Sequence, residues 1–457
     1  MRLPAALEPL ATRDYRLVFT GAVLSNSGTW MQNMAVQWFI YQETGSAAWV
    51  GAATFAQFVP LFFAGPLGGV LADRRDRKRL LFWAQAWMMA LSVVLAAVTL
   101  AGAATPELVI GLVLALGIGF AFNGPTWQAV VPHLVPSAQL TRAIALNSAQ
   151  MSTARIVGPA LGGLLVPVIG PGGIFALNAA SYVAVLVAIA LVNPPAHQPS
   201  GSESVTQQLR GGVRYALTHR VLAWLIAAVL VVSLLAAPLM ALLPVYAEDV
   251  LQAGPETYGI LMAAIGGGSL LGALLLGQFG DRLPTARLIG GALVLLGVAT
   301  ALVPVASLAP GPTLGVALTA LAVLATGTFR LGAVAASNSR LQARADDAYR
   351  GRVLSLFLIC FGGAFPLGAL LLGNAADVVG VQPVTLLMGI GTLLGGLLVG
   401  NRLAVHDRGV PEATPERADG EPAPAPADEP APAPAEEPAP GRADDEPAPA
   451  RATFGGS

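Results

Sequence analysis

The sequence predicts an all-α membrane protein with twelve transmembrane helices in two pseudo-symmetric six-helix halves. Its composition is the first observation: 55% of the residues are hydrophobic and 11% are charged, against about 25% charged in ordinary soluble domains. The second is that twelve apolar segments reach the roughly 20 residues that a membrane-spanning helix needs. The third is a charged hairpin between two apolar segments, at residues 69–79, which returns 208 residues later in a shorter form at 277–282.

The apolar segments follow one another with short polar connections. The first continues into a second span and precedes no small-residue cleavage site, so we do not read it as a cleavable signal peptide. Pro304, Pro310 and Pro312 divide the stretch between 286 and 336 into two spans. The predicted spans are 17–41, 47–71, 80–103, 108–131, 144–168, 172–193, 220–246, 257–280, 286–307, 313–336, 353–375 and 382–402.

These spans organise the chain into four parts. Residues 1–193 form the N-terminal half, 194–219 a cytoplasmic linker with helical character expected from Gln207 to Thr218, 220–407 the C-terminal half, and 408–457 a tail. The tail consists largely of Pro, Ala, Asp and Glu, which cannot bury a core, so we expect disorder with polyproline II character. It is either a solvated extension or a docking site for a partner.

Basic residues indicate the orientation of the spans. The acids near the C-terminus mask a basic membrane part, because 22 bases and 15 acids remain when the residues from Gly409 onward are set aside. These bases fall on alternate connections, and the other connections carry only acids. By the positive-inside rule, both termini of this multi-pass protein lie on the cytoplasmic side of the inner (cytoplasmic) membrane of the cell.

The offset of 208 residues relates more than the charged hairpins. It also pairs Gly119 with Gly327 and Arg142 with Arg350. Two parallel repeats related by an axis along the membrane normal are typical of transporters that bind substrate near the bilayer midplane. The repeat therefore favours a transporter.

The first hairpin resembles the signature that the major facilitator superfamily carries between its helices 2 and 3. Its residues are Gly69, Asp73, Arg74, Arg77 and Lys78. Asp76 is a departure, because the superfamily usually has Gly there.

Further segments resemble the drug-exporter branch that includes enterobactin and macrolide exporters. The resemblance covers about residues 10–403 and implies a secondary active transporter that exports a small organic molecule, siderophore-like or drug-like, by alternating access. It also implies protons as the coupling ion. The segments are 27–33, 44–46, 147–148, 155–163, 350–353, Gly362 and 366–368.

The hairpin residues predict a conformational latch. Asp73 lies at the end of a span beside a dense cluster of cations, where a carboxylate can pair with bases or with the positive end of a neighbouring helix. Breaking such pairs is what a bistable transporter needs when it opens. Gly277, Asp281 and Arg282 are the counterpart in the second half. The alternative is that the cations only fix the topology.

One face of the first span predicts a cavity wall. Asn26, Trp30, Asn33 and Gln37 stand at offsets 0, 4, 7 and 11, which share one helical face. Polar groups inside spans face the bundle interior or an aqueous cavity, so we expect contacts with substrate there; interhelical hydrogen bonds are the alternative. Further candidates in other spans are Gln57, Asn123 and Asn178.

Two arginines inside predicted spans need partners. Arg155 is near the middle of the fifth span and Arg330 is well inside the tenth, whereas no Asp or Glu lies deep in any predicted span. A central Arg costs at least about 2.5–3.5 kcal/mol on insertion, so amides, backbone carbonyls, water or the cargo must compensate it. Since an arginine fork prefers anions, an anionic or polyphenolic cargo is one hypothesis; a structural arginine near a helix bend is the other.

Gly158, Pro159, Gly162 and Gly163 resemble part of the antiporter signature of helix 5. Proline bends a helix and glycines allow close packing. Proton antiport usually needs a carboxylate inside the membrane, and this chain offers only peripheral ones such as Asp377. The sequence therefore names no proton-carrying residue.

The remaining expectations concern partners and chemistry. No phosphate loop, catalytic dyad or nucleophile elbow is present, and the single Cys360 and four scattered histidines form no disulfide or metal-ligand pattern. We therefore expect no enzyme, cofactor, metal or nucleic acid, but a monomer in the lipid bilayer with a small-molecule substrate. The alternatives are a membrane sensor or assembly protein that transports nothing, and an uptake or lipid carrier.

Overall fold

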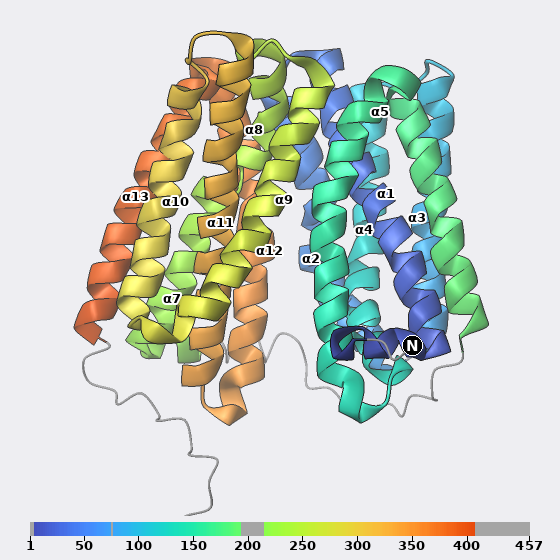
Figure 1. Cartoon of the computed structure of the whole chain (residues 1–457), viewed down its shortest axis with the longest axis horizontal. Coiled ribbons are helices and arrows are strands. Elements are labelled where there is room, and N and C mark those ends of the chain that lie inside the picture. The colour runs from blue at the N-terminus through green and yellow to red at the C-terminus, as the bar shows by residue number, and fades with distance from the viewer. Residues whose placement is uncertain (1–3, 75, 193–213, 407–457) are drawn as a thin grey trace, which may run out of the picture. The chain divides into compact units, whose positions relative to one another are not determined.

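Every element in the described part of the chain is helical. The computed structural model describes residues 4–74, 76–192 and 214–406, and it gives the backbone alone at 5, 64–74 and 348. Most of the predicted linker and the predicted tail lie outside these ranges. The helices, labelled in Figure 1, are α1 (Arg13–Thr44), α2 (Ala47–Arg74), α3 (Arg77–Leu100), α4 (Pro106–Val130), α5 (Leu140–Leu191), α7 (Arg220–Val231), α8 (Leu239–Val245), α9 (Gly254–Phe279), α10 (Thr285–Ala306), α11 (Pro312–Arg344), α12 (Asp347–Val379) and α13 (Val381–His406).

Local sequence explains where the helices begin and end. Gly45, with φ 59°, ends α1 in the left-handed conformation that glycine adopts without strain. Asp76 accepts hydrogen bonds from the backbone N–H groups of Lys78 and Arg79 and so caps α3. Asp76, the residue that departs from the superfamily signature, therefore has a structural role at this helix start.

Gly170 divides α5. Its φ of 68° and ψ of 171° are non-helical, and it lies between two helical stretches. Figure 1 shows α5 as two antiparallel rods joined by a turn. These rods match the predicted spans 144–168 and 172–193.

The predicted span 220–246 is longer and less regular in the structure. It comprises α7, a π-helical turn at Val232–Ala236, α8 and a second π-helical turn at Tyr246–Val250. Pro238 has no N–H and cannot bond to the carbonyl of Leu234, which instead lies against Gly368 of α12.

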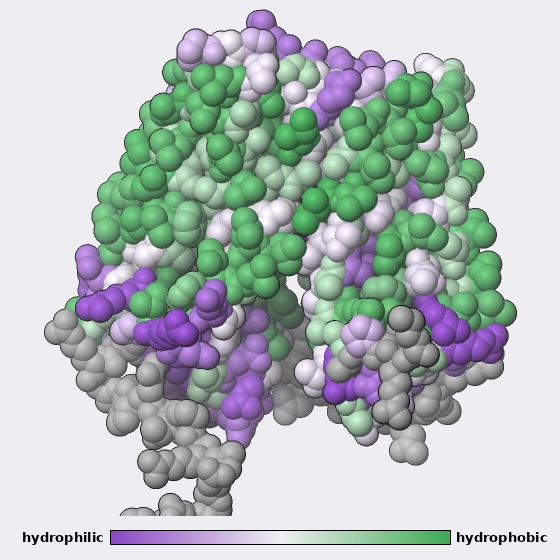
Figure 2. Space-filling model, viewed as in Figure 1, coloured by the Kyte–Doolittle hydropathy of each residue, from purple (hydrophilic) through white to green (hydrophobic). Residues whose placement is uncertain are grey.

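Nine segments in the described ranges are long and apolar enough to cross a membrane. Large apolar side chains such as Phe63, Leu164 and Leu371 are exposed on their outer faces, as expected where lipid replaces water. Figure 2 shows hydrophobic residues over the sides of the bundle and hydrophilic residues toward its two ends.

The helices belong to one compact unit and pack with a repeated pattern. We call α1–α5 the N-terminal group and α7–α13 the C-terminal group. Within the groups, α2 packs on α4 as α9 packs on α11, and α3 packs on α5 as α10 packs on α13. Between the groups, α2 packs on α12 and α5 on α9. These equivalent pairs are related by the same offset that the sequence shows.

Candidate functional site

The polar residues of α1 lie against neighbouring helices. Asn26 Nδ2 donates to Gln150 Oε1 of α5 at 3.1 Å. In the same way, Gln85 Nε2 of α3 donates to Asn123 Oδ1 of α4 at 3.0 Å. For Asn26 and Asn123, these contacts support the interhelical alternative that the sequence left open.

Further along α1, two amides continue this pattern. Asn33 Oδ1 accepts from Gln57 Nε2 of α2 at 2.8 Å, and both side chains remain partly exposed. Gln37 is buried, and its Oε1 accepts from the hydroxyl of Tyr258 of α9 at 2.8 Å. The ring of Tyr258 also stacks on Trp38, with centroids 6.0 Å apart. The Gln37–Tyr258 bond joins the two helix groups, so this face contributes to the contact between them.

The two membrane arginines lie in the same region. The guanidinium carbon of Arg155 is 5.0 Å from the centre of the Trp30 ring, a distance typical of a cation–π contact. Arg155 Nε is buried and has no hydrogen-bond partner in the described residues. Arg155 packs on Gly266 of α9, and Thr328, two residues before Arg330 of α11, packs on Gly272 of the same helix, so the two like charges lie on helices that share one stretch of α9. The sequence predicted neither the aromatic partner nor the proximity of the pair.

Glycines of α9 bring these helices together. A Cβ atom on Gly266 would lie 3.1 Å from the carbonyl oxygen of Arg155. One on Gly272 would lie 2.2 Å from the carbonyl oxygen of Thr328, two residues before Arg330. Because only glycine permits such approaches, α9 holds α5 on one side and α11 on the other.

The helix 5 motif packs against both groups. Gly158 lies against Trp30 and Ser27 of α1, while Gly163 lies against Gly259 of α9, where a Cβ atom would be 2.9 Å from the Gly259 Cα. Gly162 contacts methionines of α1. Pro159 lies inside α5, and its carbonyl oxygen also faces Gly259. The motif therefore forms part of the interface between the groups.

A carboxylate of α12 caps the start of α2. Asp377 accepts from the backbone N–H of Ala47 at 2.7 Å, from that of Ala48 at 3.2 Å, and from the hydroxyl of Ser46. These are unpaired donors of a helix N-terminus, where negative charge is favourable. Asp377 therefore links the C-terminal group to the N-terminal group.

A second link lies at the ends of α1 and of the turn after α8. The hydroxyl of Tyr41 donates to Asp249 Oδ2 at 2.5 Å. We call this side of the bundle, with Asp249 and Asp377, the acidic end, and the side with Arg77 and Lys78 the basic end. Sequence reasoning noted these carboxylates only as loop acids; the signal it missed is Ser46, a helix-capping residue type directly before α2.

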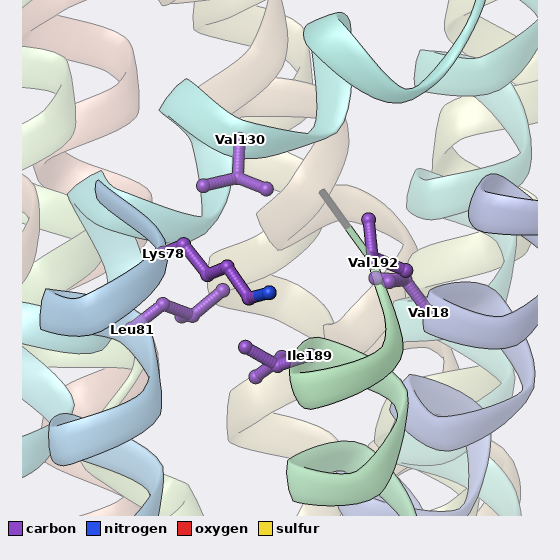
Figure 3. Close-up of a pocket in the computed structure, with 6 residues that line it drawn as sticks. All are labelled: Val18, Lys78, Leu81, Val130, Ile189 and Val192. Atoms are coloured by element: carbon purple, nitrogen blue, oxygen red, sulfur yellow. The ribbon is translucent and has the colours of Figure 1, made fainter. Parts of the chain in front are cut away.

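At the basic end, Arg77 and Lys78 bond within the N-terminal group. Arg77 Nη1 lies 3.1 Å from His133 Nε2, and Lys78 Nζ donates to the carbonyl oxygen of Ala190 at 3.1 Å. Figure 3 shows Lys78 in a small apolar pocket together with Val18, Leu81, Val130, Ile189 and Val192. Lys78 thus stabilises the C-terminal carbonyls of α5, and this pocket is separate from the arginine pair.

The structure describes the side chains of only some of the other predicted latch residues. Gly69, Asp73 and Arg74 lie in α2, but their side chains are outside the described part. In the C-terminal group, Gly277, Asp281 and Arg282 are exposed, and Arg282 lies over the Phe279 ring at 5.6 Å. The latch stays a prediction.

Contacts between the groups run from the acidic end to the middle of the bundle. Among the described side chains of α2 and α12 they extend from the Asp377 cap, past the rings of Phe58 and Phe365, whose centroids are 5.3 Å apart, to Phe62 and Gly363. Between α5 and α9 they extend from Gly163 to Gly266. Nearer the basic end, residues 141–149 of α5 and 270–279 of α9 are mostly exposed, and Figure 2 shows the surface hollowed between the groups there.

A helical membrane bundle with equivalent packing pairs and a polar, arginine-containing centre between two groups defines a transporter of the major facilitator class. The nucleoside transporter NupG has the same fold: the TM-score is 0.69 at 16% identity, covering 86% of this chain and 99% of that one. The chain belongs to the transmembrane secretion effector family, whose model matches residues 4–424.

Curated relatives over most of the chain are efflux proteins and a siderophore transporter, which favours a transporter over a sensor or an enzyme. Macrolide efflux protein A of Streptococcus pyogenes is 27% identical, covering 81% of this chain and 91% of its own. Multidrug efflux pump Tap of Mycobacterium tuberculosis is 29% identical, covering 84% and 91%. The Staphyloferrin A transporter of Staphylococcus aureus is 25% identical, covering 82% and 92%.

Proposed function

We propose that this protein exports a small organic molecule across the cytoplasmic membrane by alternating access. In this proposal, twelve helices form two halves, 1–193 and 220–407, joined by the linker 194–219, with 408–457 outside the transport unit. Among the nine long apolar segments, α5 is counted as one, and α1 and α2 are not included. Counting the two rods of α5 separately and adding α1 and α2 gives twelve membrane-spanning helices.

The observation that carries the proposal is the one-sided contact between the groups. The Asp377 cap and the Tyr41–Asp249 bond join them at the acidic end, whereas α5 and α9 are exposed toward the basic end. A carrier that is closed on one side and open on the other is one of the two states that alternating access requires.

The charge distribution supports the orientation of this state in the membrane. By the positive-inside rule, the basic end and both termini face the cytoplasm, so this state receives cargo from inside. The names of the relatives support outward transport of a drug-like or siderophore-like molecule. When the carrier rocks, the acidic-end contacts break and Asp73, Arg74, Arg77 and Lys78 close the basic end. Protons drive this exchange, and a single chain performs it.

Everted membrane vesicles test the proposal, because their cytoplasmic face is outside. Energised vesicles should accumulate at least one compound from a panel of catecholate siderophores, macrolides, cationic dyes and lysolipids. Asp73→Asn should abolish this accumulation, and Glu107→Gln, a carboxylate at the opposite end, should not. Accumulation by right-side-out vesicles but not by everted vesicles would mean that the protein imports its substrate. Equal signals from wild type and Asp73→Asn would support the sensor alternative.

A further inference from the structure

The Arg155–Arg330 pair lacks the hydrogen-bond and carboxylate partners that several arginines nearer the ends of the helices have. At the basic end, Arg340 Nη2 donates to the carbonyl oxygen of Gly280 at 3.1 Å, and Arg142 pairs with Glu8. Neither Arg155 nor Arg330 has a hydrogen bond or a carboxylate partner among the described residues. Two adjacent cations in a low-dielectric region are costly unless an anion joins them.

Trp30 compensates only part of this cost. The Arg155 guanidinium carbon lies over the Trp30 ring, but an aromatic ring offers no oxygen or nitrogen acceptor to the N–H donors of the guanidinium. The buried Nε has no hydrogen-bond partner among the described residues. An arginine with such a donor can still bind a carboxylate through two parallel hydrogen bonds.

The neighbouring amides are already paired with one another. Asn26 bonds to Gln150 and Asn33 bonds to Gln57. Side-chain amides were one class of partner, beside backbone carbonyls, water and the cargo, that the sequence offered to the arginines. Both arginines are partly exposed, and they lie where the contact between the groups gives way to the open, basic side. We expect a ligand to approach them from that side.

We propose that Arg155 and Arg330 together bind a carboxylate of the cargo, so that organic anions are the preferred substrate class. This inference rests on the proposed export function. Because Arg155 belongs to the N-terminal group and Arg330 to the C-terminal group, one carboxylate bridges them and removes their repulsion. Cargo binding thereby favours closure of the basic side around the anion.

Three probes with one ring system test the charge preference: 2-naphthoate, 2-naphthylmethanol and 2-naphthylmethylammonium. Their affinities are measured by equilibrium dialysis with the purified full chain in nanodiscs of zwitterionic lipid, which excludes anionic headgroups as competitors. We expect the carboxylate to bind at least about tenfold more tightly than the alcohol, and the ammonium to bind most weakly. Equal affinities, a preference for the ammonium, or no binding at millimolar concentration overturns the proposal.

Variants test the bridge. Arg155→Gln and Arg330→Gln should each reduce the preference for naphthoate to near unity, and the double variant should be no weaker than either single variant, since one carboxylate needs both. Independent, additive losses overturn the bridging geometry. Arg402→Gln is the matched control, because Arg402 also lies over a tryptophan, Trp224, at 5.8 Å but outside this region; it should keep the preference. If the glutamine variants do not fold, the ratio of the wild-type affinities for naphthoate and for the alcohol decides whether the site prefers an anion.

Transport separates this inference from the proposed function. If vesicles transport neutral or cationic compounds while naphthoate does not bind, the export function is supported and the anion site is refuted. If naphthoate binds through both arginines but vesicles transport no compound, the anion site is supported and the export function is refuted.

Discussion

Removing the Asp377 cap should shift the balance between the two states of the carrier. Asp377 accepts two backbone N–H bonds and one hydroxyl bond at the start of α2, and these bonds exist only while the acidic end is closed. Loss of a helix N-cap costs about 0.5–2 kcal/mol. Asp377→Ala should therefore move the equilibrium toward opening of the acidic end by about two- to thirtyfold.

A buried reporter cysteine measures this shift. Ala369 of α12 is 1% exposed and its carbonyl oxygen lies against Gly51 of α2, so it is accessible only when the acidic end opens. In a Cys360→Ser background, Ala369→Cys should react with a membrane-impermeant maleimide about two to thirty times faster when Asp377→Ala is added.

Controls make the result specific to the cap. Asp377→Asn keeps one acceptor oxygen and loses the charge, so it should fall between wild type and Asp377→Ala. Glu107→Gln removes a carboxylate at the same end and should leave the alkylation rate unchanged. An unchanged or slower rate in Asp377→Ala would refute the reasoning, because the cap would then not stabilise the closed acidic end.

Three further substitutions test the interface and the helix starts. Gly163→Val should reduce transport at least about tenfold, measured as vesicle uptake, because a Cβ atom at Gly163 would lie 2.9 Å from the Gly259 Cα. The control Gly267→Ala should leave uptake unchanged, because a Cβ atom at Gly267 meets nothing within 4 Å. Tyr258→Phe leaves buried Gln37 without its donor and should destabilise the purified protein by about 1–3 kcal/mol, seen as a lower thermal midpoint. Asp76→Ala should lower that midpoint more than Asp76→Gly, because glycine replaces an N-cap at a cost of only a few tenths of a kcal/mol.

Each of these has a contrary outcome. Normal uptake by Gly163→Val would mean that α5 and α9 need not approach closely. An unchanged thermal midpoint in Tyr258→Phe would mean that the hydrogen bond between Tyr258 and Gln37 does not stabilise the folded protein. Equal midpoints for the two Asp76 variants would show that its side-chain cap contributes nothing.

The predicted spans agree with the helices where apolar segments end at turn-forming residues such as proline. The span predicted at 286–307 is α10, Thr285–Ala306. The span predicted at 313–336 is shorter than α11, which continues to Arg344, because a helix can extend into polar residues such as Asn338 and Arg340 beyond the apolar segment. Hydropathy locates the membrane part of a helix and does not report its full length.

The candidate site was predictable only in part, for a different physical reason. The burial cost of charge marked Arg155 and Arg330 as unusual, but the contact of Arg155 with Trp30 joins residues 125 positions apart and leaves no periodic signal. The role of Asp377 was missed because two of its three donors are backbone N–H groups, which every residue type except proline carries. The latch residues Asp73 and Arg74 remain predictions.

The Tyr41–Asp249 bond has a consequence for the relation between the two halves. The two residues are 208 positions apart, which is the offset that relates the equivalent packing pairs, so the bond joins equivalent positions of the two groups. In a dimer of identical halves, a residue at this contact would face its own copy. Two aspartates there would repel each other, whereas a tyrosine and an aspartate form a hydrogen bond, so this contact depends on a difference between the two groups.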